Sequence, residues 1–228
     1  MTAQATLAAH QPAPGYWLGR NGTALLARLL ARWQVSGAEN VPCHGPLIVA
    51  ANHFSFIDPP LLAASSPRPL IFLAKAELWD SWPSRLFCRA MGVQPIRRGQ
   101  PDRAGLRRAL EALREGRALG FFPEGTRGRA RPRALKHAQA GVAWLAALSG
   151  APILPVGIAG TDVVDTASDV FRQALRRPQF TVRFGNPFHL PPGNASASGS
   201  TLTAQTEAIM REIARLLPEH YRGVYGHQ

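Results

Sequence analysis

The chain has 228 residues, of which 46% are hydrophobic and 18% are charged, and its formal net charge is +12 at pH 7. This length suits one domain with a full core and argues against two large domains, and the composition excludes a disordered or fibrous chain. Arginine, proline or glycine interrupts every apolar run before the roughly 20 residues that a membrane-spanning helix needs, which argues against an integral membrane protein.

Nearly all of the positive charge comes from arginine, because Lys75 and Lys136 are the only lysines. The arginine fork matches phosphate groups, so nucleic acid, an anionic lipid surface and a small phosphorylated substrate all remain open as partners. A GC-rich genome also enriches arginine, so charge alone does not choose among them.

The cysteines and the first residues indicate the compartment. Cys43 and Cys88 cannot form a disulfide framework and lack metal-ligand spacing, a usage typical of a reducing cytoplasm. Residues 1–15 carry neither a basic n-region nor an apolar h-region, so we expect no signal peptide.

Residues 15–33 have the period of an amphipathic helix. Its apolar stripe is made of leucines, namely Leu18, Leu25, Leu26, Leu29 and Leu30. Arg28 and Arg32 share another face. Two interpretations stay open: the stripe packs on the domain core, or the helix lies in a lipid interface with Trp17 and Trp33 near the headgroups.

From Pro42 onward, short apolar runs alternate with longer mixed segments, as in strands joined by crossover helices. The expected strands are 46–51, 70–74, 93–96, 119–122, 153–158 and 180–184. The expected helices are 60–64, 78–91, 104–115, 136–148, 170–175 and 201–217. We predict an α/β fold with a mixed, mostly parallel sheet flanked by helices. An N-terminal amphipathic segment (1–40) would precede the α/β domain (41–228).

Polar residues directly follow the first expected strand. Asn52 and His53 come after residues 47–51, and Asp58 lies five residues beyond the histidine. Ligand sites in open α/β sheets gather at the carboxyl ends of strands, so His53 is a candidate catalytic residue. Asp58 precedes Pro59, as a helix N-cap often does, but its carboxylate can also accept the Nδ1 proton of His53. In the second interpretation the two side chains form a general-base dyad.

A glycine-bearing polar loop follows the expected strand 119–122. Gly125 and Gly128 let backbone amides approach an anion, and Arg127 adds a charged bidentate donor. The loop is a candidate cradle for an oxyanion or a phosphate, with an ordinary charged turn as the alternative.

Two more expected strands end in cations, which are Lys75 on one and Arg97 with Arg98 on the other. The four strand ends together indicate a substrate hydroxyl that is deprotonated by His53. They also indicate a phosphate on that substrate, held by Arg98 and Arg127.

Four blocks of the sequence resemble, in order, those of glycerolipid acyltransferases of the lysophosphatidic acid acyltransferase type. The first is Asn-His-x4-Asp at residues 52–58, which contains the HX4D motif, and the third is Phe-Pro-Glu-Gly-Thr-Arg at residues 122–127. The weaker second and fourth blocks lie at residues 92–98 and 153–156.

The resemblance implies transfer of a fatty acyl group from acyl-CoA or acyl carrier protein to the sn-2 hydroxyl of 1-acylglycerol 3-phosphate, giving phosphatidic acid. It implies that His53 is the general base, that Asp58 orients it, and that neither a metal nor a further cofactor takes part. The expected substrate-binding residues are Lys75, Arg98, Glu124, Gly125, Thr126 and Arg127. Backbone amides near Gly125 are expected to stabilise the oxyanion.

The resemblance also implies peripheral attachment to the anionic cytoplasmic face of the cell membrane. The chain departs from the family at residues 135–139, which lack the glycine of a Lys-x-Gly step, and Arg97 can substitute for Arg98.

Three alternatives stay open beside this interpretation. The first is an acyltransferase with another acceptor, such as a lyso-ornithine lipid or a different lysophospholipid. The second is a non-catalytic basic module for nucleic acid or anionic lipid, although the scattered arginines argue against nucleic acid. The third is a thioesterase or another hydrolase. The absence of a Gly-x-Ser-x-Gly elbow argues against a hydrolase of the serine type.

Overall fold

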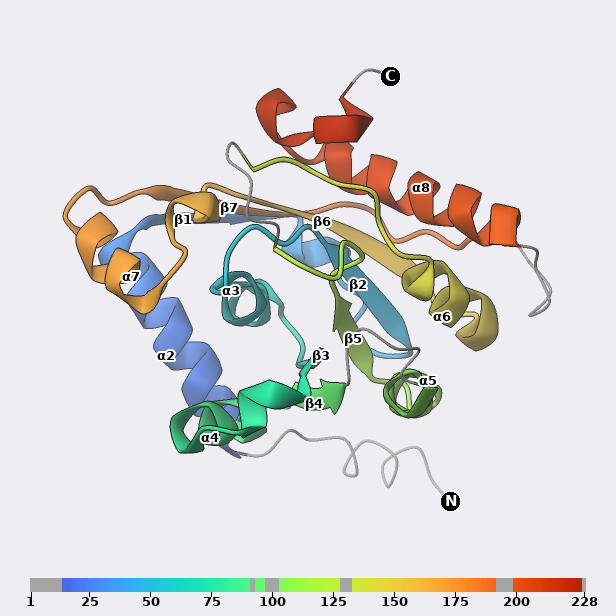
Figure 1. Ribbon diagram of the computed structural model, residues 1–228, viewed down its shortest axis with the longest axis horizontal. Coiled ribbons are helices and arrows are strands. Elements are labelled where there is room, and N and C mark those ends of the chain that lie inside the picture. Colours follow the sequence, from blue (N-terminus) through green and yellow to red (C-terminus); the bar gives the residue numbers. More distant parts are fainter. Residues whose placement is uncertain (1–13, 91–92, 97–102, 128–132, 192–198, 227–228) are drawn as a thin grey trace.

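The computed structural model describes residues 14–90, 93–96, 103–127, 133–191 and 199–226. A seven-stranded sheet forms its centre, in the order β1-β7-β6-β2-β5-β3-β4 (Figure 1). The strands are β1 (Arg32–Ser36), β2 (Leu47–Ala51), β3 (Leu70–Lys75), β4 (Val93–Ile96), β5 (Ala118–Phe121), β6 (Ile153–Ala159) and β7 (Gln179–Phe184). Neighbouring strands are parallel except β6 and β7, which are antiparallel. The predicted mixed, mostly parallel α/β fold is confirmed.

Helices cover both faces of the sheet (Figure 1). One face carries α5 (Arg103–Arg114), α6 (Gly141–Ser149) and α8 (Gly199–Arg215). The other carries α2 (Pro14–Leu30) and α3 (Asp58–Ser65), and α2 also contacts α4 (Trp82–Ala90) and α7 (Ala167–Ala174). Short 3₁₀ turns complete the fold, namely η1 (Ala38–Asn40), η2 (Ala76–Trp79), η3 (Thr161–Val163), η4 (Glu219–Tyr221) and η5 (Gly223–Tyr225).

The central strand β2 is buried along its whole length. Ile48 and Ala50 belong to the core under α5, α6 and α8, whereas Leu47, Val49 and Ala51 belong to the core under α2 and α3. Burial on both faces explains the continuous apolar run, because a parallel strand between two helical layers has no solvent face. Because β2, β5, β3 and β4 are parallel neighbours, their carboxyl ends lie side by side at one edge of the sheet.

The structure contains an edge strand, β1, that the sequence did not predict. The expected N-terminal helix reached residue 33, but α2 ends at Leu30 and the chain continues as β1, paired in parallel with β7. Trp33 and Val35 favour extended backbone, and the hydrogen bonds offered by β7 outweigh one more helical turn. The predicted division into an N-terminal segment (1–40) and an α/β domain (41–228) stays a prediction. Strand β1, which falls in the N-terminal segment, is part of the central sheet.

Helix α6 begins at Gly141, five residues later than predicted. The backbone amides of Leu135 and Lys136 donate instead to Tyr221 O at 2.8 Å and to the Glu124 carboxylate at 3.2 Å. Those contacts hold this segment extended, since an amide cannot also serve a helix.

The leucine stripe of α2 points away from the core. Leu18, Leu25 and Leu29 are exposed, while Tyr16 and Ala27 face inward. The Tyr16 hydroxyl accepts a hydrogen bond from Leu70 N at 3.0 Å, which fixes the helix against β3. The first interpretation of this helix, a stripe packed on the core, is therefore wrong. No helix within the described residues is both long and apolar enough to span a bilayer.

Candidate active site

The chain leaves β2 at a fixed point. The Asn52 side chain donates to Ile158 O at 2.8 Å and accepts from Ile158 N at 2.7 Å. Its amide therefore bonds to the backbone of β6 in the way that a further residue of β2 would. His53 follows at the carboxyl edge of the sheet, as the sequence predicts.

The structure brings His53 and Asp58 together. Nδ1 of the imidazole lies 3.0 Å from Asp58 Oδ2, and both side chains are buried. The same oxygen accepts the backbone amides of Phe54 at 2.7 Å and Ser55 at 2.6 Å. Three donors on one oxygen favour an ionised carboxylate, so Nδ1 carries the proton and Nε2 is left as the basic nitrogen.

Asp58 is the first residue of α3, and the N-cap position is Ile57, which makes no side-chain cap. The expectation that Asp58 is itself the N-cap is wrong, because its carboxylate turns back to the amides before the helix. It closes the turn between strand and helix and holds the imidazole at the same time.

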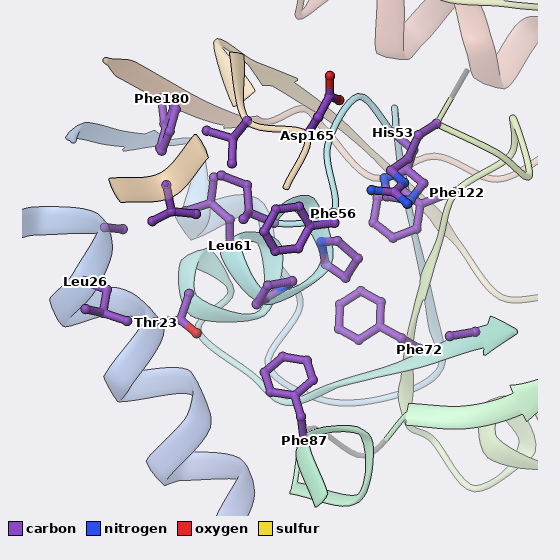
Figure 2. A pocket seen from close by; sticks show the side chains of 18 of the residues that line it. Thr23, Leu26, His53, Phe56, Leu61, Phe72, Phe87, Phe122, Asp165 and Phe180 are labelled. Atoms are coloured by element: carbon purple, nitrogen blue, oxygen red, sulfur yellow. The ribbon is translucent and has the colours of Figure 1, made fainter. Parts of the chain in front are cut away.

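A stacked phenylalanine holds the plane of the imidazole. The rings of His53 and Phe122 lie 4.4 Å apart at an interplanar angle of 28°, and Phe72 stacks beyond Phe122 with ring centroids 6.2 Å apart (Figure 2). Gly120 makes room for this stack, since a Cβ there would lie 2.3 Å from the Phe72 ring. Sequence reasoning missed this role of Phe122, although its place one residue beyond β5, beside the end of β2, was a usable signal.

Glu124 joins two loops from behind the site. Its Oε1 accepts His53 N at 3.0 Å, and its Oε2 accepts Lys136 N at 3.2 Å. Burial raises the pKa of this carboxyl to about 7, against the opposing effect of the amide donors. These contacts give Glu124 a positioning role. Its predicted contact with the substrate's phosphate stays a prediction.

Other residues of this loop reach the cavity. Lys136 Nζ donates to Thr126 O at 3.0 Å and to Thr126 Oγ1 at 3.2 Å. The lysine therefore supports the loop after β5, although the chain lacks the glycine of the family's Lys-x-Gly step. Thr126 and Arg127 are exposed and line the cavity. Gly125 has a φ of 69°, and its amide donates to Phe122 O at 3.0 Å. The Gly125 amide is thus used within the turn, and the expectation that amides near Gly125 bind an oxyanion stays a prediction.

Two predicted cationic positions are only partly placed. Arg98, with its neighbour Arg97, lies outside the described residues. Lys75 is the last residue of β3, at the same edge of the sheet as His53, but its side chain also lies outside the described part. Their roles in binding stay predictions.

Arg133 is a buried residue of the site that sequence reasoning missed. Its guanidinium donates to the carbonyl of Phe54 and to the carboxylate of Asp165. The Ser55 hydroxyl donates to the carbonyl of Val164. The turn between β2 and α3 is thus tied to the segment that leads into α7. An arginine outside the four blocks gave no sequence signal for this contact.

Tyr221 supports the same turn from the C-terminal part of the chain. Its ring packs on Phe54 with centroids 5.1 Å apart, and its hydroxyl donates to Asp162 Oδ1 at 2.5 Å. Burial and the neighbouring carboxylate raise the pKa of the Tyr221 phenol, so the hydroxyl stays a donor at neutral pH.

A cavity of about 1290 Å³ adjoins the dyad (Figure 2). The polar residues that line it include His53, Thr126, Arg127, Arg133 and Asp165, with Thr23, Ser84 and Gln173 on the surrounding helices. Apolar side chains from α2, α3, β3, α4 and α7 line most of it, among them Leu26, Leu61, Phe72, Phe87 and Val170. A large, mainly apolar pocket with several polar groups suits a ligand that has a hydrocarbon chain and a polar head. Within the described residues, no three His, Cys, Asp or Glu side chains are gathered as a metal site requires.

A protein-family model described as Acyltransferase matches residues 32–159, which is more than half of the chain. The chain belongs to the acyltransferase family. The predicted resemblance to lysophosphatidic acid acyltransferases and the prediction of an enzyme are confirmed.

The relatives and a solved structure agree with this assignment. The chain is 24% identical over 197 residues to the 1-acyl-sn-glycerol-3-phosphate acyltransferase of Bacillus subtilis, covering 86% of this chain and 94% of the relative. It is 31% identical over 144 residues to the enzyme of that name from Borreliella burgdorferi, covering 62% and 56%. It is 41% identical over 113 residues to the lyso-ornithine lipid O-acyltransferase of Pseudomonas aeruginosa, covering 49% and 40%. The crystal structure of the 1-acyl-sn-glycerophosphate acyltransferase PlsC from Thermotoga maritima matches with a TM-score of 0.65 and 25% identity, covering 89% of this chain and 79% of that one.

Replacing Asp58 by asparagine tests the dyad in this acyltransferase. One oxygen accepts all three donors, so an asparagine oxygen can keep the geometry while the negative charge is lost. We expect Asp58→Asn to remain folded and to lose about a hundredfold in kcat, because the imidazolium is no longer stabilised. Thiol release from an acyl thioester measures this, with circular dichroism as the folding control. Full activity in the variant would contradict the dyad.

The raised pKa of Glu124 predicts a pH dependence of stability. Between the ordinary value of 4.5 and about 7, the folded state binds more protons at this carboxyl than the unfolded state does. The free energy of unfolding therefore falls as pH rises through this window, by up to about 3 kcal/mol. We expect Glu124→Gln to reduce that fall, as measured by urea unfolding at both ends of the window. Equal slopes in the two proteins would contradict the raised pKa.

Arg133→Lys tests the outer support of the turn. A lysine cannot reach the Phe54 carbonyl and the Asp165 carboxylate together as the guanidinium fork does. We expect kcat to fall by about a hundredfold as the dyad shifts, with a smaller change in KM for the thioester. Steady-state kinetics measures the split. Arg133→Met should be worse than lysine, and a change confined to KM would indicate a substrate contact instead.

Proposed function

We propose that this acyltransferase moves a fatty acyl group from acyl-CoA or acyl carrier protein to the sn-2 hydroxyl of 1-acylglycerol 3-phosphate, giving phosphatidic acid. The observation that carries the proposal is the buried His53–Asp58 pair, whose histidine lines a large, mainly apolar cavity that Arg127 also lines. The names of the relatives from B. subtilis and B. burgdorferi support the acceptor.

The chemistry follows from the free imidazole nitrogen. Nε2 of His53 takes the proton of the acceptor hydroxyl as its oxygen attacks the thioester carbonyl, and Asp58 stabilises the imidazolium that forms. The tetrahedral oxyanion then collapses, the C–S bond breaks, and the imidazolium returns its proton to the departing thiolate. The products are the new ester and the free thiol, and no covalent acyl-enzyme, metal or further cofactor takes part.

The cavity offers the acceptor both polar and apolar walls. The phosphate of the acceptor lies at Thr126 and Arg127, with Lys75 and Arg98 as further proposed ligands from neighbouring strand ends. Glu124 acts behind this site by holding the His53 amide. The acyl chain occupies the apolar part of the cavity, where about 25 cal/mol is gained for each Å² of apolar surface removed from water.

A lipid acceptor requires access to a membrane. The exposed leucine stripe of α2, with Arg28 and Arg32 beside it, suits peripheral attachment to the anionic cytoplasmic face of the cell membrane.

One observation favours a second acceptor, which is the 41% identity to a lyso-ornithine lipid O-acyltransferase. The ornithine headgroup offers a carboxylate in place of a phosphate, and an arginine fork binds either group. The dyad chemistry is the same for both acceptors.

Thiol release from palmitoyl-CoA in detergent micelles tests the proposal, with 1-acylglycerol 3-phosphate, lyso-ornithine lipid or no acceptor added. We expect release that depends on the phosphate acceptor and that falls about a thousandfold in His53→Ala. Acyl carrier protein thioester is the second donor to be compared.

The outcomes separate the alternatives. Release only with lyso-ornithine lipid would replace the acceptor and keep the dyad. Release without any acceptor would indicate a hydrolase, and activity that survives His53→Ala would contradict the general base.

A further inference from the structure

The short helix α7 presents apolar side chains to solvent. Phe171 is 76% exposed and Leu175, directly after the helix, is 94% exposed. Because Phe171 and Leu175 are four residues apart, their side chains lie on the same face of the helix. A capping box of Thr166 and Asp169 forms the first turn, so the exposed face belongs to a well-formed helix and not to a loose end. Neither the Phe171 nor the Leu175 side chain lines the cavity beside His53.

Helices α2 and α4 also carry exposed apolar side chains. Helix α2 contacts both α7 and α4, and the Arg177 guanidinium donates to Arg28 O at 3.4 Å where α7 meets the end of α2. Figure 1 shows the three helices along the same side of the molecule. We call the exposed apolar residues of these helices that do not line the cavity the docking face, which consists of Trp17, Leu18, Leu25, Leu29, Trp82, Leu86, Phe171 and Leu175. An apolar surface spread over three neighbouring helices exceeds the single exposed side chains that are normal on a protein surface.

The same helices and the residues just after them also carry exposed arginines. Those that are exposed on or directly after α2 and α7 are Arg28, Arg32, Arg172, Arg176 and Arg177. Helix α2 contains no acidic residue, and on α7 Asp169 is occupied by the cap and by Arg172 at 3.4 Å. Within the described residues, Glu77 and Asp80 just before α4 are acidic. The charge around α2 and α7 is therefore complementary to anionic headgroups.

The inner sides of the same helices line the cavity. Leu26 and Leu30 of α2 and Val170 and Ala174 of α7 belong to its wall. Each helix thus has one side on the cavity and another on the docking face. A hydrocarbon chain held in this cavity lies directly beneath the surface that α2 and α7 expose.

We propose that α7 is a second membrane-docking element, which together with α2 seats the enzyme on a bilayer that contains anionic lipids. Phe171 and Leu175 enter the interface, and the arginines contact the headgroups. The inference deepens the proposed function and rests on it in one respect, since a lipid acceptor gives the contact its purpose. An acidic carrier protein would match the arginines of α7, but it would leave the apolar residues of α2 and α4 uncovered.

Vesicle flotation of the full chain tests the docking, with phosphatidylcholine vesicles that either contain or lack phosphatidylglycerol. We expect Phe171→Ser with Leu175→Ser to weaken binding at least about tenfold, because two apolar side chains no longer leave water. The matched control is Val224→Ser, which alters an exposed apolar residue outside the docking face and should bind like the wild type. In detergent micelles the double variant should keep its acyl transfer activity, since neither residue lines the cavity.

A charge variant tests the headgroup contact separately. Arg176→Gln should weaken binding to the anionic vesicles about fivefold and leave the weak binding to phosphatidylcholine unchanged. Arg114→Gln, an exposed arginine near the end of α5 on the opposite face of the sheet, is the control. Added salt should reduce the difference between wild type and Arg176→Gln.

A fluorescent label locates the contact. Leu175→Cys in a Cys43→Ser background carries an environment-sensitive dye, while Cys88 stays buried and unlabelled. We expect a blue shift when vesicles are added, and none from a label at Val224→Cys.

Unchanged flotation of the double serine variant, or an unshifted label at position 175, overturns the proposal. A double variant that binds vesicles normally but loses transfer from acyl carrier protein alone overturns it in favour of a protein partner. Failure of the proposed function is distinguishable: a wild-type protein that floats with vesicles but acylates neither acceptor supports the docking and rejects the acceptor assignment.

Discussion

A single carboxylate oxygen, Oδ2 of Asp58, is the point on which the rest of the site depends. It accepts the imidazole Nδ1 and two successive backbone amides, so the turn that leaves the sheet and the orientation of the base are one structure. The surroundings add supports from separate directions: Phe122 on the ring face, Glu124 on the His53 amide and Arg133 on the Phe54 carbonyl. Because each holds a different atom of the turn, the imidazole has little freedom left before a substrate arrives.

The central sheet and the dyad were predictable because they depend on local signals. Continuous apolar runs mark strands that are buried on both faces, and polar residues after such a strand mark the edge where ligands bind. The contacts that escaped prediction are all long-range. Arg133 meets the turn through tertiary folding alone, β1 exists because β7 offers it a partner, and Lys136 stays out of α6 because Glu124 takes its amide. Residue periodicity carries no information on such pairs.

Glu124 illustrates how a conspicuous motif residue can also hold the backbone of the site in place. Its place in a polar loop beside an arginine is typical of substrate binding, yet both of its oxygens are occupied by the backbone amides of His53 and Lys136. The charge that remains toward the cavity on this loop is that of Arg127. The exposed leucines of α2 are a similar case. An amphipathic pattern shows which residues share a helix face, but it does not show whether that face packs on the protein core or faces the surroundings.

The packing of Tyr221 on Phe54 has a consequence for how the protein becomes active. The catalytic turn is near the beginning of the α/β core in sequence, whereas its aromatic support and the β7 strand that carries β1 come late. During synthesis, the turn leaves the ribosome well before these partners exist. Local contacts between His53 and Asp58 can form early, but the complete enclosure of the site requires the last helices to be in place. Translation therefore orders the assembly, and a nascent chain carries His53 for most of its elongation without the contact between Tyr221 and Phe54 that completes its surroundings.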